Sequence, residues 1–206
     1  MTNNSVAAVD IALILPEDIL QRCIETNSRH SDPSKYVRFD EAIFIPHVTL
    51  FQCFVNLSDK DQIIADLQDV SFFLSKNPVG LEIDRISWKE ETKTFFYEFK
   101  PGGQGYQALK TLQYRVNFVM TKYMLNLQYR PNSSTFADGA PSTFDLQYVT
   151  EFQVKHTKEY YWPHITLGNS AEDMNQPVSI APFLTSQLGL FRLCSGGTCS
   201  INYRWL

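Results

Sequence analysis

Apolar and polar positions in the first half of the chain follow two periods, one typical of strands and one typical of helices. Residues 8–16 form an apolar, β-rich run that predicts a strand. Residues 16–30 begin with a proline and two acids and space their apolar positions three and four apart, which predicts a helix. Residues 39–55 predict a long second strand, and residues 58–75 predict a second helix capped by Ser58. The first half is therefore predicted to be β-α-β-α.

The second half favours antiparallel strands. Residues 81–88 and 94–100 flank the polar sequence "KEET" and predict a β-hairpin. Residues 102–128 predict a helix behind a glycine-rich entry, which lacks the GxxxxGK[ST] pattern of a phosphate-binding loop. Residues 130–145 show no periodicity and are rich in turn-forming residues, which predicts an excursion loop, either a lid or a mobile segment. Residues 148–168 have strand character, and residues 176–187 predict a short helix or loop. Residues 188–206 predict a C-terminal hairpin.

One short pattern occurs twice. "PHVTL" at residues 46–50 returns as "PHITL" at residues 163–167, with the two histidines 117 positions apart. Side chains on a strand alternate between its faces, so the histidine and threonine of each copy share one face while the two aliphatic residues point into a core. Each copy thus offers an imidazole and a hydroxyl to one side. The four side chains concerned are His47, Thr49, His164 and Thr166.

Two such pairs suit the cleavage of a phosphodiester without a metal ion. A neutral imidazole can accept the proton of an attacking water or hydroxyl, and an imidazolium can protonate the departing oxygen. Threonine hydroxyls can donate hydrogen bonds to the non-bridging phosphate oxygens. The alternative is structural, because a histidine beside a proline on a strand often serves packing alone, and a duplicated strand would repeat it. With four histidines in the chain, a chance second copy of the pattern is improbable.

These two His-x-Thr motifs, flanked by aliphatic residues in a chain of 206 residues, resemble those of the 2H phosphoesterase superfamily. The superfamily takes in cyclic nucleotide phosphodiesterases, RNA 2′-5′ ligase-like proteins, enzymes that degrade 2′,5′-oligoadenylates, and the exonuclease that trims U6 RNA. The opening "IALILP" strand and the helix that follows match its usual start. The resemblance implies an α+β, bilobal fold in which two pseudo-symmetric antiparallel sheets, flanked by helices, surround a central groove.

The same resemblance implies a site and an activity. It makes His47, Thr49, His164 and Thr166 the catalytic residues, with His164 as the base and His47 as the acid. The whole chain, residues 1–206, would be a single bilobal domain that acts on 2′,3′-cyclic or 2′,5′-linked nucleotides or RNA ends. Two alternatives stay open: a nucleotide-binding or partner-binding module of the same fold without turnover, and an RNA 2′-5′ ligase.

Residues near the motifs are candidates for substrate binding. Three aromatic residues stand directly before the second motif and can either stack on a nucleobase or pack in the core: Tyr160, Tyr161 and Trp162. Three basic residues upstream of the motifs can meet a second phosphate or lie solvated at the surface: Arg38, Lys155 and Lys158. The predicted substrate-binding set is Tyr161, Trp162, Arg38 and Lys158.

The remaining histidines and cysteines predict neither a metal site nor a disulfide scaffold. His30 and His156 lie in polar stretches and are predicted at the surface, and the sequence contains no HxH, HExxH or paired CxxC pattern. Gly196 and Gly197 predict a two-residue hairpin turn that sets Cys194 opposite Cys199, where a disulfide is geometrically possible but free thiols are expected in a reducing compartment. We therefore expect no metal and no cofactor.

Charge and hydropathy limit the partners. The net charge of −4 and the pI near 5.5 argue against binding to long duplex nucleic acid, which needs a basic stripe. The sequence contains no run of 18 apolar residues, and residues 1–18 lack the basic start of a secretory signal. We expect a cytoplasmic monomer that binds a small nucleotide or an RNA end and does not associate with membranes.

Overall fold

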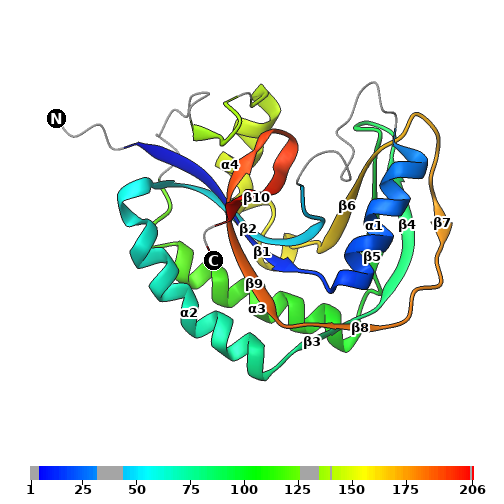
Figure 1. Ribbon diagram of the computed structural model, residues 1–206, viewed down its shortest axis with the longest axis horizontal. Coiled ribbons are helices and arrows are strands. Elements are labelled where there is room, and N and C mark those ends of the chain that lie inside the picture. The colour runs from blue at the N-terminus through cyan, green and yellow to red at the C-terminus, as the bar shows by residue number, and fades with distance from the viewer. Residues whose placement is uncertain (1–4, 32–43, 126–134, 140, 205) are drawn as a thin grey trace.

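The computed structural model describes residues 5–31, 44–125, 135–139, 141–204 and 206. Its helices and strands follow one another as shown in Figure 1. The four α-helices in this part of the chain are α1 (Glu17–His30), α2 (Lys60–Lys76), α3 (Gln104–Met120) and α4 (Thr143–Lys155). The strands are β1 (Val6–Ile14), β2 (His47–Asn56), β3 (Val79–Leu81), β4 (Ile83–Lys89), β5 (Thr94–Phe99), β6 (His164–Asn169), β7 (Gln176–Pro177), β8 (Phe183–Thr185), β9 (Gln187–Cys194) and β10 (Thr198–Arg204).

The strands form two four-stranded sheets and one small ribbon. The first sheet has the order β10-β9-β1-β2, the second has the order β6-β5-β4-β7, and β3 pairs with β8. All pairings between these strands in the described part of the chain are antiparallel. The predicted architecture of two antiparallel sheets with helices is therefore confirmed, while the β3-β8 ribbon was not expected.

The two motif strands occupy equivalent places. β2 is an edge strand of the first sheet and β6 is an edge strand of the second, and the two strands contact each other. In each motif the leucine has no partner on the neighbouring strand. Thr49 pairs with Ala12 and Phe51 pairs with Ile11, so Leu50 is the extra residue between them. Leu167 is the extra residue of β6 in the same way. Such a β-bulge bends a strand and re-aims its side chains. The repeated leucine thus coincides with a β-bulge in both strands.

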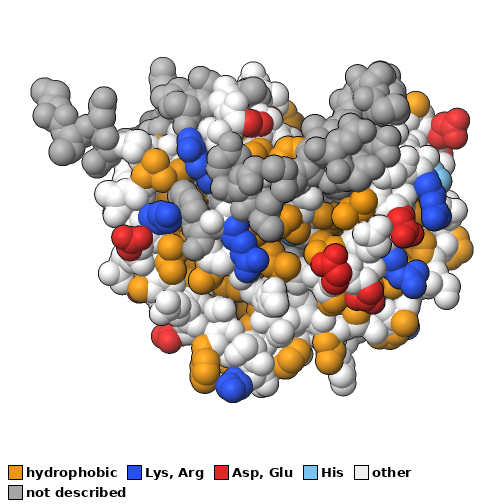
Figure 2. All heavy atoms as spheres, viewed as in Figure 1, with side chains coloured by type: hydrophobic (Ala, Val, Ile, Leu, Met, Phe, Trp, Pro, Cys, Tyr) orange, Lys and Arg blue, Asp and Glu red, His pale blue; other side chains and the backbone are white. Residues whose placement is uncertain are grey.

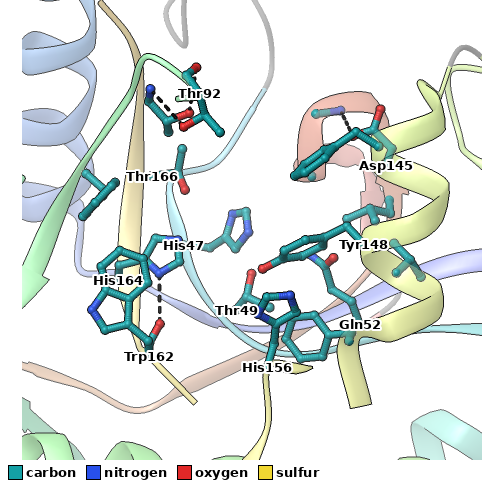
Figure 3. Close-up of a pocket in the computed structure, with 18 of the residues that line it drawn as sticks. His47, Thr49, Gln52, Thr92, Asp145, Tyr148, His156, Trp162, His164 and Thr166 are labelled. Carbon is teal, nitrogen blue, oxygen red and sulfur yellow. Dashed lines mark hydrogen bonds between the residues drawn. The ribbon is translucent and has the colours of Figure 1, made fainter. Parts of the chain in front are cut away.

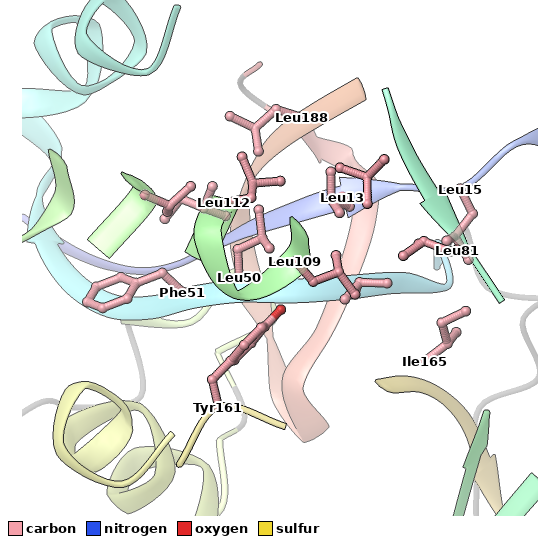
Figure 4. Packing of buried hydrophobic residues seen from close by; sticks show 14 of the residues in the cluster. Leu13, Leu15, Leu50, Phe51, Leu81, Leu109, Leu112, Tyr161, Ile165 and Leu188 are labelled. Carbon is pink, nitrogen blue, oxygen red and sulfur yellow. The ribbon is translucent and has the colours of Figure 1, made fainter. Parts of the chain in front are cut away.

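The helices cross between the sheets. α1 follows β1 of the first sheet but packs on β6 of the second, whereas α3 follows β5 of the second sheet and packs on β2 of the first. One cluster of buried apolar side chains accordingly joins residues of both sheets, from Leu13 and Leu50 to Ile165 (Figure 4). This shared core fixes the position of one motif relative to the other.

The segment 148–168 differs most from the prediction. Its first part belongs to α4, which begins inside the predicted excursion loop of 130–145, so that loop prediction is wrong from residue 143 onward. Ser142 and Asp145 form a capping box, and buried Phe152 anchors the helix on Phe51 of β2 in an edge-to-face contact. These contacts outweigh the strand preference of the β-branched residues. Residues 130–134 lie outside the described part of the chain.

Three smaller predictions are also corrected. Residues 176–187 contain short strands, β7 and β8, because they pair with β4 and β3. Ser58 does not cap α2, since it lies in a 3₁₀ turn (Leu57–Asp59) and Asp59 precedes the helix. The turn between β9 and β10 spans three residues, Ser195–Gly197, so Cys194 pairs with Thr198 rather than with Cys199, and all four cysteines are free thiols.

The face of the molecule shown in Figure 2 carries charges of both signs. On the face shown in Figure 2, Lys and Arg side chains lie among Asp and Glu side chains and apolar patches rather than in one continuous basic stripe. No helix among the described residues is long and apolar enough to cross a membrane.

Gly168, beside the second bulge, provides a test of this packing. Its φ is +141°, and an added Cβ would overlap the Ser31 Oγ and press on Asn27, which donates to the Leu167 carbonyl at 2.7 Å. We expect Gly168→Ala to lower the free energy of unfolding by about 3 kcal/mol, from strain and overpacking together. Urea denaturation measures this.

Gly102→Ala is the matched control, because Gly102 also has a positive φ of +75° but has open space around its Cβ position. We expect this variant to lose only about 1 kcal/mol. Equal losses in the two variants would contradict the tight packing of α1 on β6.

Candidate active site

A cavity of about 600 Å³ lies between the two motifs, within the size range of small-molecule sites (Figure 3). All four predicted catalytic side chains line it: His47, Thr49, His164 and Thr166. The bulky aliphatic residues of both motifs are fully buried, as the alternation of strand side chains requires. The sequence prediction therefore placed the four side chains correctly on one cavity.

The two histidines are oriented in the same way. His47 Nδ1 lies 2.7 Å from the Ile45 carbonyl oxygen, and His164 Nδ1 lies 3.0 Å from the Trp162 carbonyl oxygen. Because a carbonyl can only accept, Nδ1 carries the proton in both rings. Nε2 is therefore the atom of each ring that can exchange a proton with a molecule in the cavity. In both motifs the acceptor is the carbonyl two residues before the histidine.

A fully buried acid lies beside the first motif, on the neighbouring strand β1, and the described residues place no fully buried acid beside the second. Asp10, fully buried on β1, accepts hydrogen bonds at Oδ2 from Thr49 Oγ1 at 2.9 Å and from Gln52 Nε2 at 2.7 Å. The same oxygen lies 3.4 Å from His47 Nε2. The bulge at Leu50 makes this network possible, since it turns Thr49 and Gln52, three residues apart, to the same face of the sheet.

The pKa values of the two histidines shift in opposite directions, and Asp10 accounts for the shift of His47. Burial opposes the charged form of His47, but the Asp10 carboxylate more than offsets it and raises the pKa of His47 above its ordinary value. Burial lowers the pKa of His164 to about 4, and the positive charges of Lys89, His47 and His156 act in the same direction. At neutral pH, His164 is therefore neutral and His47 is the better proton donor.

Three side chains could in principle ligate a metal ion. Ligand atoms of Asp10, His47 and Cys199 lie within 4.8 Å of one another, and the Cys199 Sγ is 3.7 Å from His47 Nε2. Sequence patterns could not reveal this cluster, because its members come from three separate strands. Oδ2 of Asp10 already accepts from two donors, and burial raises the pKa of the Cys199 thiol well above its usual range. Both features disfavour a metal ion relative to the proton network.

A row of aromatic rings on α4 forms the opposite wall of the cavity. Phe144, Tyr148, Phe152 and His156 recur every four residues and therefore share one face of the helix. Tyr148 stacks on Phe144 with ring centroids 5.8 Å apart and lies 4.4 Å from His156. The prediction of His156 as a surface residue is wrong, because this helix turns it into the cavity. His30 is exposed as predicted, but it ends α1 rather than lying in a loop.

The predicted substrate-binding residues divide into three groups. Trp162 lines the cavity, where its ring lies 4.4 Å from that of His164 and beneath the Lys89 ammonium at 4.2 Å. Tyr161 also borders the cavity but is only 4% exposed, and its hydroxyl donates to the Thr49 carbonyl at 2.9 Å, so it fastens the motifs together and offers little stacking surface. Lys158 is exposed and does not line the cavity. Arg38 lies outside the described residues.

The structure also shows where the other candidate residues next to the second motif lie. Tyr160 is 63% exposed and, like Lys158, does not line the cavity. Lys155 pairs with Glu151 at 2.6 Å on the surface of α4. Among the described residues that line the cavity, Lys89 is the one lysine or arginine. The cavity therefore gives no support to the predicted binding role of Lys158, and Lys155 lies at the surface, which is the alternative that the sequence left open.

Sequence reasoning missed four side chains of the site: Asp10, Lys89, Tyr148 and His156. Asp10 carried a signal, because it is the one charged residue in the apolar strand of residues 6–14. The aromatic row carried another, since a spacing of four would have shown a helical face. Lys89 had none, because only the register of β4 and β5 brings it beside Trp162.

The role of Asp10 can be tested by NMR titration of the histidines. We expect the pKa of His47 to lie above about 6.5, its ordinary value, and that of His164 to lie near 4. In Asp10→Asn, only burial acts strongly on His47, so its pKa should fall below about 6.5 while that of His164 barely changes. An unchanged His47 titration would contradict the proposed coupling.

No protein-family model matches the chain, and no curated protein matches it in sequence. Solved structures do match. The apo form of E. coli LigT covers 90% of this chain with 86% of its own, at 15% identity and a TM-score of 0.52. E. coli LigT complexed with 3′-AMP covers 91% of this chain with 87% of its own, at 15% identity and a TM-score of 0.52. Its complex with NADP+ covers 90% of this chain with 86% of its own, at 14% identity and a TM-score of 0.51.

The likeness extends over most of both chains, although it is remote in sequence. Together with the two antiparallel sheets and the paired His-x-Thr strands that face one cavity, it confirms the fold that the motifs predicted. The chain has the α+β fold of the 2H phosphoesterases.

Proposed function

We propose that this protein is a phosphodiesterase that cleaves 2′,3′-cyclic or 2′,5′-linked nucleotides, or the corresponding RNA ends, by acid-base catalysis between His164 and His47. The observation that carries the proposal is the pairing of two histidines with the same orientation and opposite pKa shifts on one cavity. General acid-base catalysis needs such a pair, one neutral and one protonated at the working pH.

The reaction follows from the two protonation states. The neutral Nε2 of His164 accepts the proton of a water molecule or ribose hydroxyl as its oxygen attacks phosphorus. The protonated Nε2 of His47 gives its proton to the departing ribose oxygen as the bond to phosphorus breaks. The proton taken up at one histidine balances the proton lost at the other, and exchange with water restores both. This assigns His164 as the base and His47 as the acid.

Developing negative charge on the phosphoryl oxygens needs donors inside the cavity. Thr166 is exposed to the cavity, and its hydroxyl makes no side-chain hydrogen bond with the described residues, so it can donate to a phosphoryl oxygen. The Lys89 ammonium supplies a positive charge at the same wall. No step requires a metal ion.

Known ligands of a fold relative support a nucleotide as substrate. E. coli LigT has been solved in complex with 3′-AMP and with NADP+. The cavity of about 600 Å³ is of a size to hold a small ligand, and its aromatic walls suit nucleobases. We further propose that the chain acts as one bilobal domain, as a monomer in the cytoplasm, on short substrates rather than on long duplexes.

The test is hydrolysis of a panel of 2′,3′-cyclic nucleotides and 2′,5′-linked oligoadenylate in EDTA, with products resolved by phosphorus NMR. We expect the wild-type protein to turn over at least one of them. His47→Ala and His164→Ala should each lower kcat by on the order of 10³-fold or more, because each removes one proton-transfer group and leaves its partner without a role.

His30→Ala is the matched control, since His30 is exposed on α1 and does not line the cavity. It should retain wild-type activity. Full activity in both single variants, or activity that EDTA abolishes, would contradict the mechanism. Tight nucleotide binding without any product would instead support a binding module.

A further inference from the structure

Unlike the hydroxyl of Thr166, the hydroxyl of Thr49 already has a hydrogen-bond acceptor among the described residues. Thr49 Oγ1 donates its single proton to Asp10 Oδ2 at 2.9 Å. A hydroxyl has one proton, so while this bond lasts Thr49 cannot donate to a phosphoryl oxygen. Asp10 is fully buried and also accepts from Gln52, which fixes its position. The first motif therefore leaves the transition state one donor short on its side of the cavity.

Tyr148 offers a hydroxyl to the same cavity. Its side chain projects from α4 into the cavity that His47 and Thr49 line (Figure 3). The hydroxyl makes no hydrogen bond with any residue in the described part of the chain. Tyr161, which also lines the cavity, differs in this respect, because its hydroxyl donates a hydrogen bond to the Thr49 carbonyl.

The ring of Tyr148 is held on several sides. Phe144 stacks on it at 5.8 Å, and His156 lies 4.4 Å away with its plane tilted by 31°. Phe152 meets its edge at 5.7 Å and is itself anchored on Phe51. A donor that is fixed before the reaction costs no reorganisation during it, which is the condition for effective transition-state stabilisation.

We propose that Tyr148 is a further catalytic residue, whose phenol donates a hydrogen bond to a non-bridging phosphoryl oxygen in place of the hydroxyl that Thr49 gives to Asp10. The phenol stays protonated throughout the working range, since burial and the nearby Asp10 raise the pKa of Tyr148 to about 12. Thr166 and Tyr148 then hold the phosphoryl group from opposite walls. This proposal rests on the proposed phosphodiesterase activity.

The test compares Tyr148→Phe with the wild-type protein on the best substrate of the panel. The variant keeps the ring and its stacking but lacks the donor. We expect kcat to fall by on the order of 10²-fold, as when one donor to a developing oxyanion is removed, with KM changed by less than about 3-fold. Thermal unfolding should be unchanged, because the hydroxyl makes no hydrogen bond with the described residues that the substitution could remove.

Tyr160→Phe is the control, because Tyr160 is 63% exposed and does not line the cavity, and it should match the wild-type protein. Wild-type kcat in Tyr148→Phe, or a loss confined to KM, would overturn the catalytic role while leaving the two histidines in place. Inactivity of the wild-type protein on every substrate would overturn the proposed function itself, and the role of Tyr148 with it.

A second readout does not depend on turnover. Calorimetry with 2′-AMP measures the binding of a phosphomonoester, whose oxygens are charged in the ground state. Tyr148→Phe should raise the Kd by about 5- to 10-fold relative to the wild-type protein, because one donor to a charged oxygen is lost. Equal affinities would contradict a contact between the phenol and the phosphate.

Discussion

The site depends on how two edge strands are held face to face. β2 and β6 belong to different sheets, and a hydrogen bond from the Tyr161 hydroxyl to the Thr49 carbonyl ties the chain just before the second motif to the middle of the first. The shared apolar core and the exchange of α1 and α3 between the sheets hold the same arrangement. Edge strands usually expose unpaired backbone groups as a liability. Here they bring two imidazoles to one cavity.

The near-symmetry of the motifs ends at Asp10. Both histidines use Nδ1 in the same way, and both motifs place a bulge at their leucine, so the backbone treats the two copies alike. Among the residues that the structure describes, only the first motif has a fully buried carboxylate beside its histidine. That one difference separates the two imidazoles into a donor and an acceptor, and it also occupies the Thr49 hydroxyl. The asymmetry of the proposed acid and base roles thus follows from one side chain on a neighbouring strand.

The sequence was sufficient for the repeated elements and insufficient for the wall opposite them. His47 and His164 were found because a five-residue pattern recurred, and β1 and α1 followed from clear periodicity. α4 was missed because its β-branched residues and its turn-rich start mask a helix that depends on packing against Phe51. Tyr148 and Lys89 were missed with it, since their places depend on tertiary contacts that no local pattern encodes.

The most direct test of the central claim is the pH dependence of kcat/KM, measured in EDTA for the wild-type protein and Asp10→Asn. The base must be neutral, so activity should rise as the pH passes about 4, the pKa of His164. The acid must be protonated, so activity should fall as the pH passes the raised pKa of His47. In Asp10→Asn only the alkaline limb should move, to lower pH. A shift of the acid limb instead, or of neither, would contradict the assignment of His164 as base and His47 as acid.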